Sequence, residues 1–274
     1  MTNMRNLNNS SEYYKRSKAV LAGASTFGKG VDQFAYGITP YALERGEGAY
    51  LWDVDGNRYL DTTMSLGAVF LGYCNPIVDK AIQQQLKNGI SFSLVHRLEV
   101  EVGEMLCERI PCADMVRLGK NGSDVCTAAI RLSRYVTGNN HVLFCGYHGW
   151  QDWYISKTSM NGGIPSEVGD YSHRFPYNDL SALEALLQEL EGKTACIIME
   201  PTSRIHPKEG YLQGVRDLAD KYQVVLIFDE VVTGFRFHRG GYQSVCGVTP
   251  DLACFSKAMG NGVPIAALVG KRLV

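Results

Sequence analysis

The segment VVLIFDE, residues 224–230, places five apolar residues directly before two carboxylates. An apolar run of this length, rich in branched side chains, predicts a strand that is buried on both faces. Similar runs predict strands at 116–119, 142–145, 195–199 and 252–256, and amphipathic segments at about 123–137, 179–191 and 209–221 predict helices between them. This alternation is typical of a doubly wound α/β fold with a mostly parallel sheet and flanking helices.

The earlier part of the chain has a different pattern. Residues 11–22 predict a short helix, and the glycine-rich loop AGASTFGKG follows at 22–30. The stretch GAYLWDVDGNRYLD, residues 48–61, alternates apolar and polar side chains around Asp55-Gly56 and predicts a β-hairpin. Two further helices are predicted, at 76–88 and at about 96–109.

Composition excludes several classes of function. The 274 residues carry 27 basic and 28 acidic side chains, a net charge of -1, so no basic face predicts binding to nucleic acid or to a membrane surface. The polar start of the chain lacks the apolar core of a signal peptide, and the apolar runs are too short to span a membrane. Eight scattered cysteines without a CxxC pair favour a reducing cytoplasm, and no zinc-ligand spacing is present, so no metal is expected.

Ligands of open α/β sheets bind beyond the carboxyl ends of the strands. The residues found just after the predicted strands are Gly122-Ser123, Tyr147-His148, Glu200, Asp229 and Lys257. A lysine, carboxylates, an aromatic ring and a Gly-Ser helix start are therefore expected on one rim. We take this rim as the candidate binding site for a small molecule.

Lys257 and Asp229 carry the strongest chemical signal of the set. Lys257 follows a buried strand and precedes Gly260 and Gly262, which allow a bulky ligand to approach the backbone. It can be a surface lysine, or a lysine that forms a Schiff base after desolvation lowers its pKa. Asp229 can be a helix cap or half of an ion pair, or it can keep a pyridine nitrogen protonated. A strand-end pair of this kind favours the second interpretation for both residues.

The other rim residues each have two interpretations. Gly122 and Ser123 open a helix whose free N–H groups suit a phosphate, but Ser123 can also be a plain helix cap. Tyr147 can lie on the face of a cofactor ring or pack in the core. Glu200 can position a water or a cofactor group, or cap a helix, and His148 can form a structural hydrogen bond.

Four segments resemble the class III aminotransferases, and in particular the glutamate-1-semialdehyde 2,1-aminomutases within that class. They are NGSDVCTAAIRLSR (121–134), GYHGW (146–150), IFDEVVTGFR (227–236) and DLACFSKAMGNGVP (251–264). The resemblance implies a fold type I enzyme that uses pyridoxal 5'-phosphate (PLP), usually as a homodimer with active sites at the subunit interface. It also implies two parts, an N-terminal segment (1–62) of a helix and a β-hairpin, and a PLP-binding large domain (63–274).

The resemblance assigns roles to single residues. Lys257 matches the Schiff-base lysine and Asp229 the partner of the pyridine nitrogen. The remaining cofactor contacts are Gly122 and Ser123 for the phosphate, Tyr147 stacked on the ring, and Val231 under its opposite face. Glu200 is kept as a further cofactor-binding candidate.

The chain departs from the aminomutase pattern at three points. Lys29 stands where the aminomutase has an arginine that grips the substrate carboxylate, and lysine cannot form the same two-pronged contact. Leu66 stands where it has an aromatic residue. The chain also stops at Val274, so it is expected to be a partial member without the C-terminal small domain and without the Gly-Thr loop that contacts the phosphate in the neighbouring subunit.

The sequence therefore predicts a PLP-dependent aminotransferase that moves an amino group between a small-molecule donor and a carbonyl acceptor. Two alternatives stay open, an aminomutase that moves the amino group within one molecule and a truncated, non-catalytic member of the family. A dinucleotide-binding dehydrogenase is disfavoured because no G-x-G-x-x-G motif follows a strand.

Overall fold

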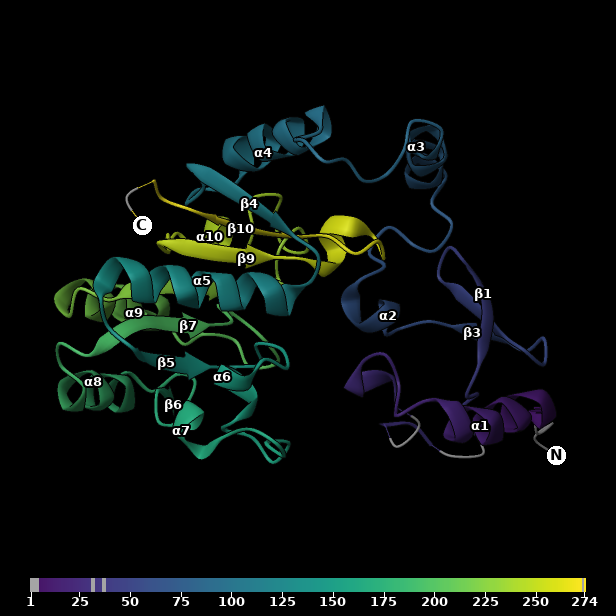
Figure 1. Cartoon of the computed structure of the whole chain (residues 1–274), viewed down its shortest axis with the longest axis horizontal. Helices are drawn as coiled ribbons and strands as arrows, with labels where there is room; N and C mark the ends of the chain where they lie inside the picture. The colour runs from purple at the N-terminus through teal and green to yellow at the C-terminus, as the bar shows by residue number, and fades with distance from the viewer. Residues whose placement is uncertain (1–4, 31–32, 36–37, 273) are drawn as a thin grey trace. The chain divides into compact units, whose positions relative to one another are not determined.

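The computed structural model describes residues 5–30, 33–35, 38–272 and 274. The chain divides into two compact units, residues 1–90 and 91–274 (Figure 1). The division expected after residue 62 concerns where a cofactor-binding domain begins, and it stays a prediction. Among the described residues, none of the helices has the length and apolar character needed to cross a bilayer.

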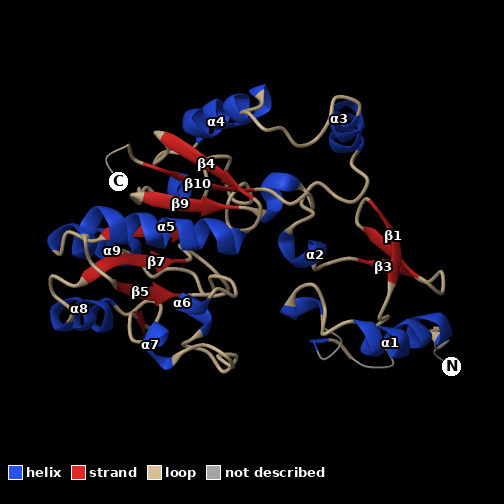
Figure 2. Cartoon of the chain, in the orientation of Figure 1, coloured by secondary structure: helices blue, strands red, loops and turns tan. Residues whose placement is uncertain are grey.

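The first unit combines helices with a small antiparallel sheet whose strand order is β1-β2-β3 (Figure 2). The expected hairpin is present, since β2 and β3 pair across the Asp55-Gly56 turn. Its elements are α1 (Asn8–Val20), the short helix η1 (Phe27–Lys29), β1 (Leu43–Glu47), β2 (Tyr50–Asp53), β3 (Arg58–Leu60), the turn α2 (Met64–Gly67) and α3 (Pro76–Leu86).

The hairpin turn also fixes the start of α1. Both carboxylate oxygens of Asp55 accept hydrogen bonds from the helix, from the backbone N–H of Asn9 and of Ser10, each at 2.8 Å. The buried Ser10 hydroxyl in turn accepts the N–H of Tyr41 at 2.6 Å. Helix, turn and the strand entrance are thus joined by polar contacts between residues far apart in the sequence.

The turn α2 has an unusual backbone. Met64, Ser65 and Leu66 have φ angles of 52°, 51° and 58°, in the left-handed region that residues with a Cβ rarely occupy. Asp61 holds the entrance to this turn, because its Oδ1 accepts the N–H of Thr63 and of Met64. The left-handed turn directs the Ser65 and Leu66 side chains into a pocket of the same unit.

The second unit is built on one sheet. Among its described residues, seven strands pair in the order β4-β10-β9-β8-β7-β5-β6, and β10 alone runs antiparallel to its neighbours. The strands are β4 (Met115–Gly119), β5 (His141–Cys145), β6 (Ser172–Arg174), β7 (Thr194–Met199), β8 (Val225–Asp229), β9 (Leu252–Phe255) and β10 (Ala266–Gly270). The helical elements are α4 (Arg97–Arg109), α5 (Gly122–Thr137), α6 (Asp152–Ile155), α7 (Ser166–Gly169), α8 (Leu180–Glu189), α9 (Tyr211–Lys221), α10 (Gln243–Cys246) and η3 (Lys257–Gly260).

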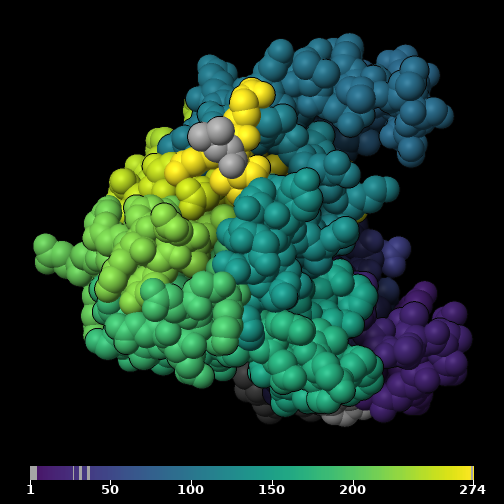
Figure 3. All heavy atoms as spheres, turned by 60° about the vertical axis from the view of Figure 1, so that its left-hand side comes forward, coloured from purple at the N-terminus to yellow at the C-terminus, as the bar shows by residue number. Residues whose placement is uncertain are grey.

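Helices cover both faces of this sheet. Apolar side chains of α4, α8 and α9 pack on one face, and those of α5 and α6 pack on the other. Figure 1 shows α5 lying over the sheet in front of β7 and β9, and Figure 3 shows the region of α8 and α9, coloured green, as a continuous outer surface. The central strands β7, β8 and β9 are buried along their whole length, as the apolar runs predict.

The fold prediction is confirmed for the class of fold and for each of the five expected strands. The expected strand at 224–228 corresponds to β8, which ends one residue later on Asp229. The short edge strand β6 and the antiparallel β10 were not expected from the sequence. Insertion of β10 between β4 and β9 makes the sheet mixed rather than wholly parallel.

Candidate active site

The loops that follow the parallel strands of the second unit meet at one rim, and three glycines show how closely they approach. A Cβ on Gly122 would come within 2.8 Å of the Val231 side chain, and a Cβ on Gly146 within 2.7 Å of Glu200 Oε2. Gly149 lies directly against the Ser123 side chain. The structure therefore brings together residues that follow β4, β5, β7 and β8, as the strand-end rule predicts.

Asp229 is the most connected side chain of the rim. It ends β8, is 3% exposed, and accepts hydrogen bonds on both oxygens. Oδ1 accepts the N–H of Val231 at 3.1 Å. Oδ2 lies 2.7 Å from His148 Nδ1 and 3.4 Å from the thiol of Cys126. These donors compensate for the cost of burying a carboxylate at the end of an apolar strand.

His148 is held by acceptors on both sides of its buried ring. Its Nε2 lies 3.1 Å from the carbonyl oxygen of Cys145, which can only accept, so Nε2 carries a proton. Its Nδ1 faces Asp229 Oδ2, and at 2.7 Å one proton lies between these two atoms. With both ring nitrogens bonded to the protein, the His148 ring is oriented by the strand end rather than by solvent.

Lys257 follows β9, the strand next to β8 in the sheet. Its backbone has a φ of 47°, a left-handed conformation that costs a non-glycine residue about 1 kcal/mol. Burial lowers the pKa of the Lys257 ammonium, and the charges of Asp229 and Glu200 act in the opposite direction. The loop around Lys257 is tied back to the sheet, because the Ser256 hydroxyl donates to the Ile265 carbonyl at 2.8 Å.

Glu200 and Tyr147 lie together on the same rim. The Tyr147 N–H donates to Glu200 Oε2 at 3.2 Å. Burial, and then the Asp229 charge, raise the pKa of Glu200. Tyr147 is 58% exposed, and its ring makes an edge contact with Tyr154 with 5.6 Å between the ring centroids, so this side chain is accessible to a ligand.

The N-terminus of α5 supplies N–H groups to this rim. Asn121 caps the helix, and its Oδ1 accepts the N–H of Asp124 at 3.0 Å. Within the described chain, the backbone N–H groups of Gly122 and Ser123 donate to no acceptor. A helix start of this kind, free of a side-chain cap on its first two N–H groups, suits an anionic group.

Two contributors were undervalued or missed in the sequence. His148 was given only a structural role, yet it contacts Asp229 directly. Cys126 was not considered, although it follows Gly122 by four residues on a predicted helix and so lies on the same face as the phosphate candidate. Glu230, next to Asp229, is fully buried and holds the backbone of Gln243 and Tyr242 instead of facing the rim.

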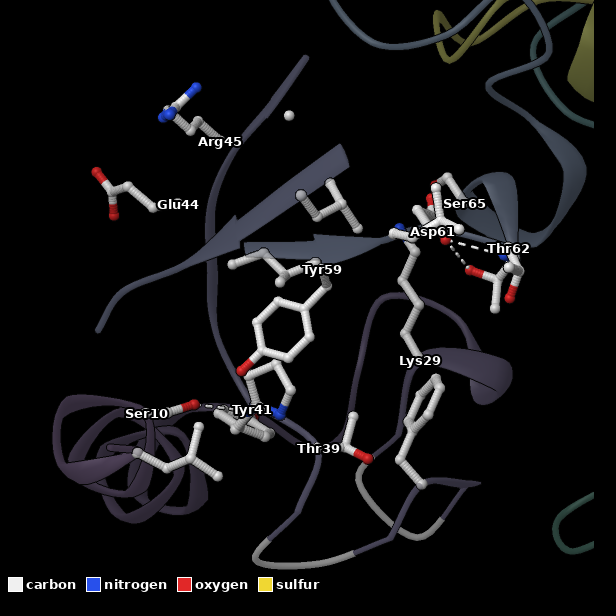
Figure 4. Close-up of a pocket in the computed structure, with 18 of the residues that line it drawn as sticks. Ser10, Lys29, Thr39, Tyr41, Glu44, Arg45, Tyr59, Asp61, Thr62 and Ser65 are labelled. Carbon is white, nitrogen blue, oxygen red and sulfur yellow. Dashed lines mark hydrogen bonds between the residues drawn. The ribbon is translucent and has the colours of Figure 1, made fainter. Parts of the chain in front are cut away.

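A separate pocket of about 790 Å³ lies within the first unit (Figure 4). Lys29 and Leu66, the two positions at which the sequence departs from the aminomutase pattern, both line it. A Cβ on Gly28 would come within 3.0 Å of Leu66 Cδ1, so the glycine-rich loop packs on the left-handed turn. The rest of the wall mixes tyrosines with Asp61, Thr62 and Ser65.

Comparison with known proteins gives a consistent result. A family model described as Aminotransferase class-III matches residues 33–274. The chain is 43% identical to a 3-aminobutyryl-CoA aminotransferase of Cloacimonas acidaminovorans (strain Evry), over 87% of this chain and 58% of the relative. It is 36% identical to a glutamate-1-semialdehyde 2,1-aminomutase of Methanocaldococcus jannaschii, over 97% of this chain and 65% of the relative.

Solved structures agree with the sequence relatives. The FumI protein of Sphingopyxis sp. MTA144, solved in its PLP internal aldimine form, matches with a TM-score of 0.90 at 26% identity. That match covers 96% of this chain and 65% of the solved one. The chain thus spans less than two thirds of the length of the proteins it resembles.

Proposed function

Because this chain belongs to the class III aminotransferase family, we propose that it transfers an amino group between a small-molecule donor and a carbonyl acceptor with PLP as its cofactor. One observation carries the proposal. Asp229 ends the buried strand β8, and Lys257 follows the neighbouring buried strand β9. The charges of the two side chains interact. An amine of lowered pKa beside a hydrogen-bonded carboxylate is the pair that this chemistry needs.

The residues of the rim fit the chemical groups of PLP. The N–H groups of Gly122 and Ser123 at the start of α5 would hold the phosphate. Asp229 would receive the ring nitrogen, while Tyr147 and Val231 would contact the two ring faces. Glu200, whose pKa is raised mainly by burial, would position a polar group of the cofactor or a water.

PLP, when bound, withdraws electrons from the substrate carbon that carries the amino group. Lys257 would hold the cofactor covalently through Nζ and then, once released by the incoming amine, carry a proton to and from that carbon. Burial favours the neutral, nucleophilic form of this amine. Asp229 would keep the ring nitrogen charged, and His148 would keep Asp229 in place.

The Lys257→Ala variant tests the proposal. We expect purified protein mixed with PLP to gain a visible absorption band that borohydride removes, with the reduced cofactor recovered on the peptide that contains Lys257. Lys257→Ala should lose this band, and Lys193→Ala, which changes an exposed lysine of the same unit, should keep it. Recovery of the reduced cofactor on another lysine would disprove the assignment.

For the substrate, we propose a β-amino acyl thioester of the kind named by the 3-aminobutyryl-CoA relative. That relative has the higher identity of the two reported. A thioester has no free carboxylate at the acyl end, and Lys29 replaces the arginine expected to bind one. We expect single-turnover amino transfer from 3-aminobutyryl-CoA to be faster than conversion of glutamate-1-semialdehyde. Preference for the semialdehyde, with the amino group retained in the product, would instead identify an aminomutase.

We further propose that the chain acts as a homodimer in the cytoplasm. Helix α3 has no buried residue, although Ile77 is 80% exposed and Leu86 57% exposed. Apolar side chains that are left in water in this way favour burial against a second copy. All eight cysteines lie among the described residues as free thiols, which supports a reducing compartment.

A further inference from the structure

The Asp229 carboxylate has a second donor whose role the proposed function does not use. We propose that Cys126 is a positioning residue for Asp229. Together with His148, Cys126 holds Oδ2 of that carboxylate, and this leaves Oδ1 to receive the ring nitrogen of the cofactor. This inference rests on the proposed function. It concerns a contact between a buried thiol and a buried carboxylate at 3.4 Å.

The assignment of the two oxygens follows from counting acceptor positions. Each carboxylate oxygen accepts about two hydrogen bonds. Both positions on Oδ2 are used, by His148 Nδ1 and by the Cys126 thiol. On Oδ1, the described part of the chain supplies one donor, the N–H of Val231. One position on Oδ1 therefore remains for an N–H of a bound ligand.

The direction of the thiol proton is fixed by its neighbours. An ionised carboxylate can only accept, so the single proton of Cys126 points to Asp229 Oδ2. Cys254, which pairs with Asp229 across β8 and β9, is a neighbour of the Cys126 side chain. The Cys254 side chain, burial and the Asp229 charge together raise the pKa of the Cys126 thiol, so that it stays protonated. The Cys126 thiol is therefore a hydrogen-bond donor to Asp229.

The location of Cys126 explains why its contact matters. It lies in α5, one turn after the Gly122-Ser123 start of the helix, and is 1% exposed. The helix that offers its N-terminus to the phosphate is thus also bonded to the carboxylate that would receive the ring nitrogen. Cys126 fixes the separation between these two contacts by donating to Asp229 Oδ2.

Two pairs of variants separate the hydrogen bond from packing. Cys126→Ser keeps a donor and Cys126→Ala removes it. Cys126→Thr and Cys126→Val repeat the comparison with two side chains of equal shape, in case the smaller pair does not fold. Cys196→Ala is the matched control, because Cys196 is a fully buried thiol of the same apolar cluster and lies on β7.

The first readout needs no cofactor. In ¹⁵N-histidine-labelled protein, the Nδ1 proton of His148, identified by its loss in His148→Gln, should move downfield in Cys126→Ala, because Oδ2 loses a competing donor. The second readout is the affinity for PLP, which should fall about 5-fold in Cys126→Ala, the size expected for one hydrogen bond. Cys126→Ser and Cys196→Ala should stay within about 2-fold of the parent chain by the same scale.

The outcomes are distinct. Equal behaviour of the Ala and Ser variants, or of the Val and Thr variants, would show that Cys126 only fills space and would overturn the inference. An unmoved His148 resonance in Cys126→Ala would do the same. If neither the parent chain nor any variant bound PLP while the resonance shifted as expected, the hydrogen bond from Cys126 to Asp229 would stand and the proposed function would fail.

Discussion

A buried carboxylate at the end of an apolar strand needs several donors to remain ionised. Asp229 has three, and they come from α5, from the loop after β5 and from its own turn. Such a carboxylate is oriented before any ligand arrives. Its charge, rather than its ability to form a hydrogen bond, is what would keep a pyridine nitrogen protonated.

Asp229→Asn tests that role of the charge. The neutral amide keeps the shape of the side chain but cannot favour a protonated ring nitrogen. We expect single-turnover amino transfer to slow by more than about 100-fold, because electrostatic contacts in a dry site contribute several kcal/mol. The exposed Asp152→Asn should leave the rate unchanged. A loss of only a few-fold in Asp229→Asn would contradict the role.

Glu200 gives a pH-dependent prediction of stability. Burial raises its pKa above the usual 4.5, so the folded protein binds this proton more tightly than the unfolded chain. The ionised form therefore destabilises the fold, and stability is lost as pH rises from 4.5 through the folded pKa. We expect Glu200→Gln to stabilise the cofactor-free protein at pH 7 by on the order of 1 kcal/mol in urea unfolding.

The gain in Glu200→Gln should disappear well below pH 4.5, where the carboxyl is protonated in both states. Glu191→Gln, at an exposed position before β7, should show neither the gain nor its pH dependence. A stabilisation of Glu200→Gln that is equal at both pH values would point to packing instead of charge.

For single residues, the sequence predicts those at strand ends well and those on helices poorly. Asp229 and Glu200 were found because a strand end can be read from where an apolar run stops. Cys126 was missed because its direction depends on the rotation of α5 about its axis, which is set by the packing of that helix on the sheet. His148 was undervalued because its loop position gives no direction for the ring.

Among the elements, burial decides which ones the sequence predicts. Four of the five expected strands are apolar runs, and β7 and β8 have no exposed residue. The edge strand β6 has three residues, Ser172–Arg174, and too little apolar character to be seen. Strand β10 reads as AALVG, whose small residues do not distinguish a strand from a helix, and its antiparallel position is set only by the sheet.

The contact between Asp55 and α1 is an element-scale feature that no local pattern predicts. We expect Asp55→Ala to destabilise the first unit by about 1 kcal/mol, since it removes the acceptor of two N–H groups at the helix start. Hydrogen exchange at Asn9 and Ser10 should accelerate before exchange in β2 does. The stability of Asp55→Asn, which retains one acceptor oxygen, should lie between that of the parent chain and that of Asp55→Ala. Unchanged protection of α1 in Asp55→Ala would show that another group caps the helix.

At the scale of the whole molecule, the two units differ in how much apolar surface they bury. The second unit surrounds its sheet with two continuous apolar clusters. In the first unit, apolar side chains of α3 and of the turn before it stay exposed, among them Leu71 at 59% and Ile82 at 38%. An apolar helix face of this size is rarely left in water, and the dimer proposed above would bury it.

Dimer formation through α3 can be tested by placing one charge on that face. Ile77 is 80% exposed, so in a monomer Ile77→Glu should change stability by no more than about 0.5 kcal/mol. In a dimer that buries this position, the carboxylate loses its water and the interface weakens by several kcal/mol. We expect sedimentation equilibrium to show a dimer for the parent chain and a monomer for Ile77→Glu. We also expect the melting temperature of the parent to rise with protein concentration.

Ile205→Glu makes the same substitution at a position that is 64% exposed in the second unit, and it should remain dimeric. A monomeric parent chain, or dimers of equal strength in both variants, would place the subunit contact elsewhere or remove it, because a buried glutamate on α3 cannot leave a tight apolar interface unaffected.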